Sequence, residues 1–309
     1  MAKYLFAASV CAVLVLTFSA GARATSLTSA GAQLDTDWQC VGLGGLRGIG
    51  NGTITLAGVS GTVSRAYLYW HGPTDVANGN TDITFNGNAI TGTSVGVGGD
   101  NCWGMATSEA YRADVTPLIS GNGGYTVANL MKTGVEINGV SLLVFFDDGN
   151  AANNRDVYLY EGTDTIAGGG GDPAGWDATF AGINYGGGAA SILLGVSDGQ
   201  IYSDADTLLD ATVLVPGPNA FQGDSVPDAG SAAQFNGGLW DLKSFDITSY
   251  LSLGTNSLHL TAALDSDCLG LIHVAVDVPT ATGVVPEPLT MAGLVLGIGG
   301  LVRYVRKRR

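Results

Sequence analysis

The sequence predicts an all-β protein built from two tandem β-sandwiches of jelly-roll type, and three observations support this fold class. The chain of 309 residues contains 23 Asp against 4 Glu, and it contains 48 Gly. Asp and Gly favour turns whereas Glu favours helices, so this composition indicates many strands joined by many turns. Short apolar runs of strand length are bounded by Gly, Asn and Asp, and helical periodicity is almost absent between the two ends of the chain.

The expected strands follow one another through both halves of the chain. Ala66–Trp70 is aromatic and β-prone, and Ile83–Phe85 enters an Asn86-Gly87 turn, the dipeptide typical of a tight hairpin. Val140–Phe146 is apolar on both faces, which predicts a central strand. Further strands are expected at Val157–Tyr160, Ser191–Val196, Ala211–Val215, Leu258–Leu264 and Leu271–Val278.

A weak internal repeat relates the two halves. Asp114–Ile119 matches Asp246–Leu251 at an offset of 132 residues, and each copy leads through turn residues to a strand. Each Asp can cap a one-turn helix whose apolar residues seal the end of a sandwich. We therefore predict a first sandwich at residues 25–162 and a second at 163–280, with a flexible joint at Gly168–Pro173 and a linker at 281–285.

The N-terminus has the features of a secretory signal peptide. Lys3 supplies the positive charge, Leu5–Leu16 is almost entirely apolar, and Ala22-Arg23-Ala24 has the small–x–small pattern of a cleavage site. The apolar run is shorter than the ~20 residues of a membrane-spanning helix. We therefore expect residues 1–24 to be removed and the mature chain to begin at Thr25.

The C-terminus has three parts in a fixed order. Val285-Pro286-Glu287-Pro288 precedes an apolar run at Leu289–Val302. A basic tail follows, made of Arg303, Arg306, Lys307, Arg308 and Arg309. Residues 286–309 resemble the PEP-CTERM sorting signal of exosortase-bearing, Gram-negative bacteria. The resemblance implies a single transmembrane helix, export by the Sec translocon, and cleavage near the Pro-Glu-Pro motif by an exosortase.

Elementary membrane physics agrees with this resemblance. A helix over Leu289–Val302 would reach about 21 Å, short of a ~30 Å hydrocarbon core, and Arg303 can snorkel to close the gap. The basic tail should remain cytoplasmic by the positive-inside rule. We expect the protein to be anchored in the inner membrane before processing, and to reach the outer surface or extracellular matrix afterwards. A plain tail anchor is the alternative.

The body of the chain is strongly acidic. Residues 25–285 contain 26 acidic against 6 basic residues, which leaves a formal charge of −20, whereas the whole chain carries −14. A surface with this charge repels phosphate backbones. The composition therefore excludes nucleic acid as an expected partner.

The sequence carries no recognisable catalytic motif. The patterns G-x-G-x-x-G, G-K-[ST], H-E-x-x-H and paired C-x-x-C are absent from it, and G-x-S-x-G occurs at Gly92–Gly96 and Gly195–Gly199 without the strand-to-helix pattern of a nucleophile elbow. We therefore expect no catalytic residues and no firm cofactor. One weak candidate is a Ca²⁺ site on Asp147, Asp148 and Asn150, whose oxygens are the hard ligands that Ca²⁺ prefers. Their spacing fits no known calcium loop, and all three are ordinary turn residues.

Two further patterns suggest weak binding sites. A hairpin centred on Ser266 would place His259 opposite His273, a pair that supplies only half of a zinc site. Tryptophans can also serve as sugar platforms, although burial in a sandwich would account for at least three of the five. The tryptophans are Trp38, Trp70, Trp103, Trp176 and Trp240.

Three cysteines remain in the mature chain, because Cys11 leaves with the signal peptide. Export to an oxidising compartment favours one disulfide and one leftover thiol among Cys40, Cys102 and Cys268. We expect Cys40–Cys102, since both residues fall in the predicted first sandwich and close the shortest loop. A bridge to Cys268 would instead mean that the first half packs against the second.

These observations predict a non-enzymatic, exported protein of the cell surface or biofilm matrix, associated with exopolysaccharide. A carbohydrate-binding module is the first alternative, and exposed aromatic residues in a row on one sheet would favour it. A secreted glycoside hydrolase is the second, and it requires a cleft with two carboxylates of separated pKa. An ice-binding or adhesion protein is the third, although regular Thr arrays are absent from the sequence.

Overall fold

The computed structural model describes residues 25–99, 102–166, 175–230 and 237–280. The expected signal peptide, flexible joint, linker, sorting motif and basic tail lie outside these residues. The described chain contains strands and two one-turn 3₁₀ helices but no α-helix, so the all-β prediction is confirmed. No helix in these ranges is long and apolar enough to cross a membrane.

The strands form one large and two small antiparallel sheets. The large sheet has the order β15 (Trp240–Asp246), β12 (Ser191–Ser197), β17 (Gly270–Pro279), β10 (Arg155–Thr165), β1 (Thr25–Leu43), β9 (Gly139–Asp147), β3 (Thr62–Thr74), β7 (Thr107–Asp114) and β6 (Thr93–Gly98). One small sheet has the order β2 (Gly52–Leu56), β8 (Gly123–Ala128), β4 (Asp82–Phe85) and β5 (Asn88–Thr91). The other has the order β11 (Trp176–Tyr185), β16 (Gly254–Ala262), β13 (Thr207–Leu209) and β14 (Thr212–Val215).

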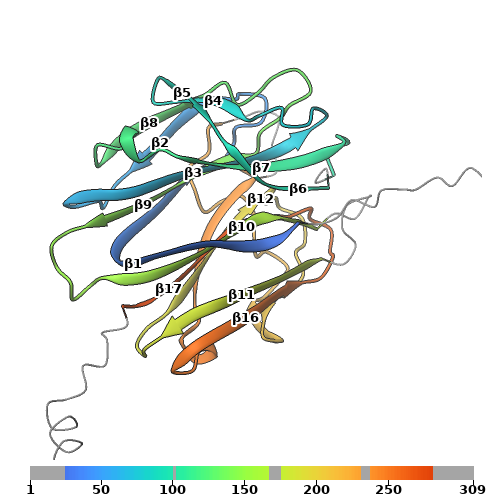
Figure 1. Ribbon diagram of the computed structural model, residues 1–309. Helices are drawn as coiled ribbons and strands as arrows, with labels where there is room; N and C mark the ends of the chain where they lie inside the picture. Colours follow the sequence, from blue (N-terminus) through green and yellow to red (C-terminus); the bar gives the residue numbers. More distant parts are fainter. Residues whose placement is uncertain (1–24, 100–101, 167–174, 231–236, 281–309) are drawn as a thin grey trace, which may run out of the picture.

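Strand β1 pairs with two different strands along its length. This strand pairs with β10 up to Thr36 and with β9 from Asp37 onward. A register shift between Gln33 and Thr36, with Asp35 at φ 54°, marks the bend. The two halves of the large sheet consequently face one another, and a small sheet covers each of them, so that four layers are stacked in Figure 1.

Three apolar cores separate the four layers. One outer core lies beneath β2, β4 and β8, and the other lies beneath β11 and β16. The middle core joins the inner layers through residues such as Leu143, Phe145, Val157, Leu193 and Ala275. Residues 139–146 of β9 are all buried, and β9 lies between β1 and β3, which confirms the predicted central strand.

The predicted repeat corresponds to two equivalent structural units. A 3₁₀ turn, η1 (Thr116–Leu118), follows β7, and a second, η2 (Thr248–Tyr250), follows β15. Asp114 Oδ1 accepts a hydrogen bond from the Thr116 backbone N–H at 3.0 Å, and Asp246 Oδ1 accepts the matching bond from Thr248 at 2.8 Å. Each carboxylate therefore holds the first helical residue, as the sequence predicts.

The two halves of the chain share one sheet. The predicted boundary at residue 162 falls inside β10, which pairs with β17 as well as with β1. The first strand thus joins strands from both halves, and the division into separate domains stays a prediction.

The expected Cys40–Cys102 disulfide is wrong. The structure has a Cys102–Cys268 disulfide with a Cα–Cα distance of 6.1 Å, and Cys40 is free. Cys40 lies on β1 against the middle core, whereas Cys102 and Cys268 lie in the loops before β7 and β17. The bridge therefore links the two halves, because their inner layers pack face to face.

Candidate functional site

Two open pockets lie next to each other at the end of the molecule where β17 ends (left in Figure 1), and both are lined by Arg155. Side chains alternate along a strand, so Arg155 and Asp277 share the inner face with Val157 and Ala275 of the middle core. Two pockets of about 290 and 300 Å³ meet at Arg155. We call this feature the end groove and define it by Trp38, Gln39, Ser60, Arg155, Ser244 and Phe245.

An ion pair forms the floor of the end groove. Arg155 Nε donates to Asp277 Oδ1 at 2.5 Å, and Arg155 Nη2 donates to the Ala189 carbonyl at 2.7 Å. Asp277 also accepts from the Trp38 side chain and from Ser191 Oγ. Burial raises the pKa of Asp277, and the neighbouring guanidinium opposes this rise. The pair is thus fixed in place between the two pockets.

A second polar cluster lines the wall beside β1. Asn153 Nδ2 donates to Asp37 Oδ1 at 2.9 Å and to Asp148 Oδ2 at 3.1 Å, and the Asp148 backbone N–H donates to Asp37 Oδ2. Burial and the adjacent Asp148 carboxylate raise the pKa of Asp37. This wall is therefore acidic, and its carboxylates are fixed by hydrogen bonds from the Asn153 side-chain amide and the Asp148 backbone N–H.

The side chains of the predicted Ca²⁺ ligands accept hydrogen bonds from backbone N–H groups of their own turn. Asp147 Oδ1 accepts from the Gly149 backbone N–H, Asp148 Oδ1 from Asn150, and Asn150 Oδ1 from Ala152. The residues that the structure describes contain no group of three His, Cys, Asp or Glu able to hold a metal. A Ca²⁺ site here stays a prediction.

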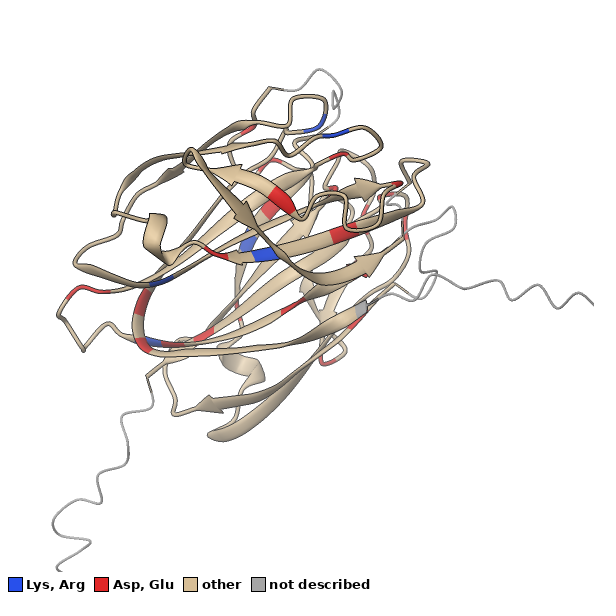
Figure 2. Cartoon of the chain, turned by 45° about the horizontal axis from the view of Figure 1, so that its top comes forward, with Lys and Arg blue, Asp and Glu red and all other residues tan. Residues whose placement is uncertain are grey.

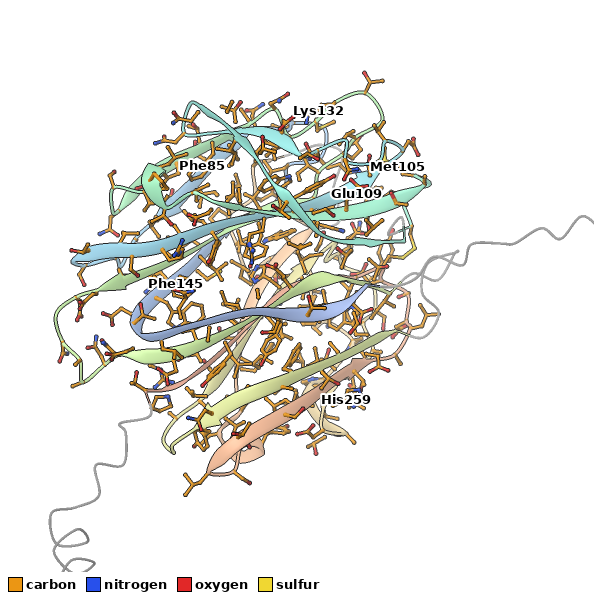
Figure 3. All side chains as sticks on the ribbon, in the orientation of Figure 1. Phe85, Met105, Glu109, Lys132, Phe145 and His259 are labelled. Atoms are coloured by element: carbon orange, nitrogen blue, oxygen red, sulfur yellow. A yellow bond between two sulfur atoms is a disulfide. The ribbon has the colours of Figure 1, made fainter. Side chains whose placement is uncertain are left out.

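The predicted pairing of His259 with His273 is wrong. His259 lies on β16 in an outer sheet (Figure 3), and its Nε2 contacts Asp177 Oδ1 at 2.7 Å. His273 is buried on β17, where its Nε2 contacts Ser141 Oγ at 2.7 Å and its ring packs on Tyr69. The chain crosses from an outer to an inner layer between β16 and β17, so no hairpin forms there.

A buried network near the disulfide contains a serine and a histidine in contact. His71 Nδ1 lies 2.7 Å from Ser197 Oγ, and Asn138 Nδ2 donates to the same hydroxyl at 3.0 Å. Asn138 also donates to Asp198, which accepts from Trp103 Nε1. Both His71 and Ser197 are fully buried, and burial lowers the pKa of His71 to about 3. His71 is therefore neutral, and its contact with Ser197 lies inside the packed layers.

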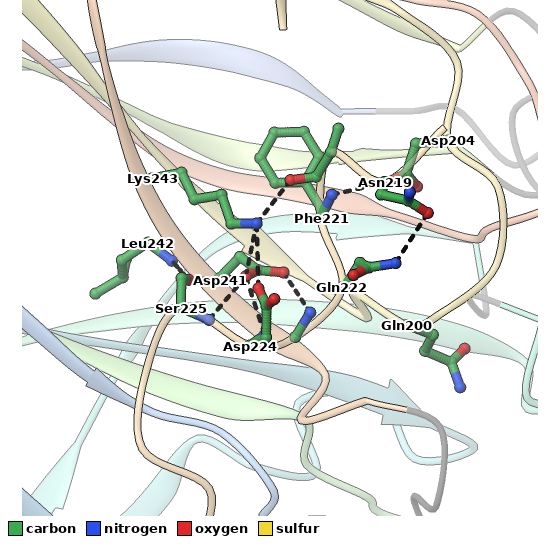
Figure 4. A network of polar contacts seen from close by, with 12 residues as sticks. Gln200, Asp204, Asn219, Phe221, Gln222, Asp224, Ser225, Asp241, Leu242 and Lys243 are labelled. Atoms are coloured by element: carbon green, nitrogen blue, oxygen red, sulfur yellow. Dashed lines mark hydrogen bonds and ion pairs between the residues drawn. The ribbon is translucent and has the colours of Figure 1, made fainter. Parts of the chain in front are cut away.

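Three buried carboxylates lie beneath the loops of the second half. Asp241 accepts from the Gly223 backbone N–H and from Ser225 Oγ, both at 2.7 Å, and Lys243 Nζ lies 3.7 Å away (Figure 4). Burial raises the pKa of Asp204 to about 6 and that of Asp267 to about 7. These are the perturbed carboxylates that a hydrolase would need, but they are buried and bind backbone amides.

The basic residues of the described body are dispersed among more numerous acidic ones (Figure 2). Arg47, Arg65, Arg112, Arg155 and Lys243 each form an ion pair with an Asp or Glu. Each of these five basic residues is therefore matched by a nearby carboxylate.

The tryptophans fall into two groups. Trp70, Trp176 and Trp240 are buried in cores, which confirms that burial accounts for three of them. Trp103 packs under the Arg47 guanidinium at 3.5 Å and binds Asp198. Only Trp38, among the five, lines the end groove, and its place on β1 could not be inferred from its neighbours in sequence.

Comparisons with known proteins add little to this geometry. No protein-family model and no curated protein matches the chain. Among solved structures, the chain is similar to a β-porphyranase of glycoside hydrolase family 86 from the human gut bacterium Bacteroides plebeius, with a TM-score of 0.26 and 14% sequence identity. The match covers 81% of this chain and 37% of that enzyme, and a likeness of this size bears on neither fold nor activity.

Proposed function

We propose that the chain is an exported, non-enzymatic protein of the bacterial cell surface or extracellular matrix. The observation that carries this proposal is the Cys102–Cys268 disulfide, which links the loops of the two halves. Structural disulfides persist outside the cytoplasm and are rare inside it. The bridge therefore supports the export that the residues before Thr25 predict.

Transient anchoring and exosortase processing form the second part of the proposal. They depend on the resemblance of residues 286–309 to a PEP-CTERM signal, which lies outside the described residues. The described body ends at Thr280, whose backbone N–H reaches the Asn154 carbonyl. The Pro-Glu-Pro motif begins six residues later, so a protease acting there would leave the sheets whole.

The non-enzymatic part of the proposal is supported by burial. Both the Ser197–His71 contact and the perturbed carboxylates Asp204 and Asp267 are closed to solvent and bonded within the fold. Of the alternatives, a carbohydrate-binding module is favoured by one observation, the polar end groove with Trp38 in its wall.

Mass spectrometry of the protein from its native host tests export and processing together. The secreted form should begin at Thr25 and end near Pro288. A Glu287→Ala variant should keep its C-terminal segment, whereas Asp265→Ala, a change in an exposed loop of the body, should be processed normally. An extracellular form that retains Arg309 would contradict the proposal.

A further inference from the structure

The end groove crosses both halves of the large sheet and has the size of a short oligosaccharide site. Its two pockets of about 290 and 300 Å³ meet at Arg155. A single sugar ring with its hydroxyls occupies a comparable space, so the two pockets suit consecutive rings of an extended polymer.

Uncharged hydrogen-bonding groups line this path without partners. Among the described residues, the Gln39 amide and the hydroxyls of Ser60 and Ser244 make no side-chain hydrogen bond. An amide and a hydroxyl each offer both a donor and an acceptor. Sugar hydroxyls need the same combination, so these three groups match a polyhydroxylated ligand.

Apolar surface lies beside the polar groups. Trp38 borders the first pocket and Phe245 borders the second, and each is partly exposed. Aromatic rings next to hydrogen-bonding groups suit ligands that have both apolar faces and polar edges. A pyranose ring has this character, with C–H groups on its faces and hydroxyls at its rim.

The charge around the end groove selects the class of polymer. Asp37, Asp148 and Asp246 line the two pockets, and the one cation, Arg155, already pairs with Asp277. This surplus of carboxylates repels uronic-acid and sulfated polymers. The site therefore suits an uncharged chain.

From these four observations we propose that the end groove binds a segment of a neutral polysaccharide, with Gln39, Ser60 and Ser244 holding sugar hydroxyls and Trp38 and Phe245 covering sugar faces. This binding goes beyond the proposed surface location by naming a ligand class. The groove is built within residues 37–246, so it does not depend on cleavage of the C-terminal segment.

Isothermal titration calorimetry on the purified full-length chain in mild detergent tests the inference. The probes are neutral α- and β-glucans, a galactan and a mannan, with alginate as the anionic polymer. At least one neutral polymer should bind, and alginate should bind more weakly or not at all. No heat with any neutral polymer, or tighter binding of alginate, would overturn the inference.

Variants localise the binding. Gln39→Ala combined with Ser244→Ala should weaken it about tenfold, because two hydrogen bonds of ~0.5–1.5 kcal/mol each are lost. Ser60→Trp should fill the first pocket and abolish binding. Thr126→Ala, in a separate pocket on β2 and β8, should leave the affinity unchanged. Equal affinity for all four proteins, at unchanged melting temperature, would place the polymer elsewhere and refute the end groove. Processing is read separately by mass spectrometry, so the two proposals can fail independently.

Discussion

Ser141 and His273 contact each other across the middle of the molecule, and they are 132 residues apart, which is the offset of the internal repeat. Ser141 lies on β9 and His273 lies at the matching position of β17. When two equivalent units face each other about an approximate two-fold axis, positions near the axis meet their own counterparts. The contact therefore indicates that the two halves are related units that pack against each other, rather than separately folded domains.

This contact predicts the effect of removing its hydroxyl. Ser141→Ala should destabilise the fold by about 1–3 kcal/mol, because the buried His273 ring loses its one side-chain hydrogen bond among the described residues. Ser141→Ala combined with His273→Phe should recover part of the loss, since neither partner is then left unpaired. Urea denaturation measures both, with Ser64→Ala at a half-exposed hydroxyl as control. Equal stability of Ser141→Ala and wild type would contradict the assignment.

Gly195 lies directly beneath the same histidine. A Cβ at this position would come within 2.2 Å of His273 Nε2, and the ring is enclosed by the inner layers. Gly195→Ala should therefore cost about 1–3 kcal/mol through overpacking. Gly124→Ala on β8 is the matched control, because its nearest neighbour is the Thr53 Cγ2 methyl at 3.0 Å, which can move. Thermal melts of the two variants should separate clearly, and similar melting temperatures would refute tight packing at Gly195.

The buried carboxylates predict a pH dependence of stability. Burial raises the pKa of Asp204 to about 6 and that of Asp267 to about 7, whereas an unfolded Asp titrates near ~3.9. These two groups thus hold more protons in the folded state than in the unfolded state between these values, so their contribution to stability is fully present below pH ~4 and is lost as the pH rises to ~7. Burial lowers the pKa of His71 and His273 to about 3, so these two groups contribute in the opposite direction, and their contribution is lost as the pH falls below ~6.5. The contribution of Asp204 and Asp267 that is lost over this window is on the order of 7 kcal/mol, at ~1.36 kcal/mol for each unit of raised pKa.

Urea titrations at a series of pH values measure this slope. Asp267→Asn should make the slope more positive between pH ~4 and ~7, because the falling contribution of this group is removed, while Asp265→Asn in the same loop should leave it unchanged. The exposed carboxylates of Asp114 and Asp246, whose pKa is lowered by hydrogen bonds from Thr116 and Thr248, act in the opposite direction only below about pH 4. The same slope in Asp267→Asn and the wild type would contradict the raised pKa of Asp267.

The disulfide predicts which cysteine peptides are linked and how much stability is lost when the bridge is removed. Non-reducing peptide mapping should recover Cys102 joined to Cys268 and Cys40 as a thiol. Cys102→Ser should destabilise by about 5 kcal/mol in the chain-entropy model, since the bridge spans 166 residues. Burial raises the pKa of Cys40, so this thiol should alkylate more slowly in the folded protein than after unfolding. A peptide joining Cys40 to either other cysteine would refute the pairing.

Local features of the fold could be predicted from the sequence because they depend on neighbouring residues. The Asn86-Gly87 turn adopts the positive φ angles that the dipeptide favours, and Val140–Phe146 is buried as its composition requires. The two Asp-capped turns also follow from short motifs. The conformation of each of these features is determined by a few consecutive residues.

Long-range pairing could not be predicted in this way. Residues 25–43 are rich in Thr, Ser, Gly and Asp and were not expected as a strand, yet they form the strand at the bend of the large sheet. The Cys102–Cys268 bridge and the separation of His259 from His273 both depend on how the layers stack. The end groove joins segments of β1, β10 and β15 that are far apart in sequence.

The position of β1 also sets an order of events during synthesis. The first strand made is an interior strand of the sheet, and its partners β9 and β10 begin more than 90 residues after it ends. The last strand, β17, must in turn insert between β10 and β12. Sheets that join such distant segments form slowly, because long loops must close before the pairs can stabilise them. A chain that emerges N-terminus first therefore cannot complete its large sheet until Pro279 is free.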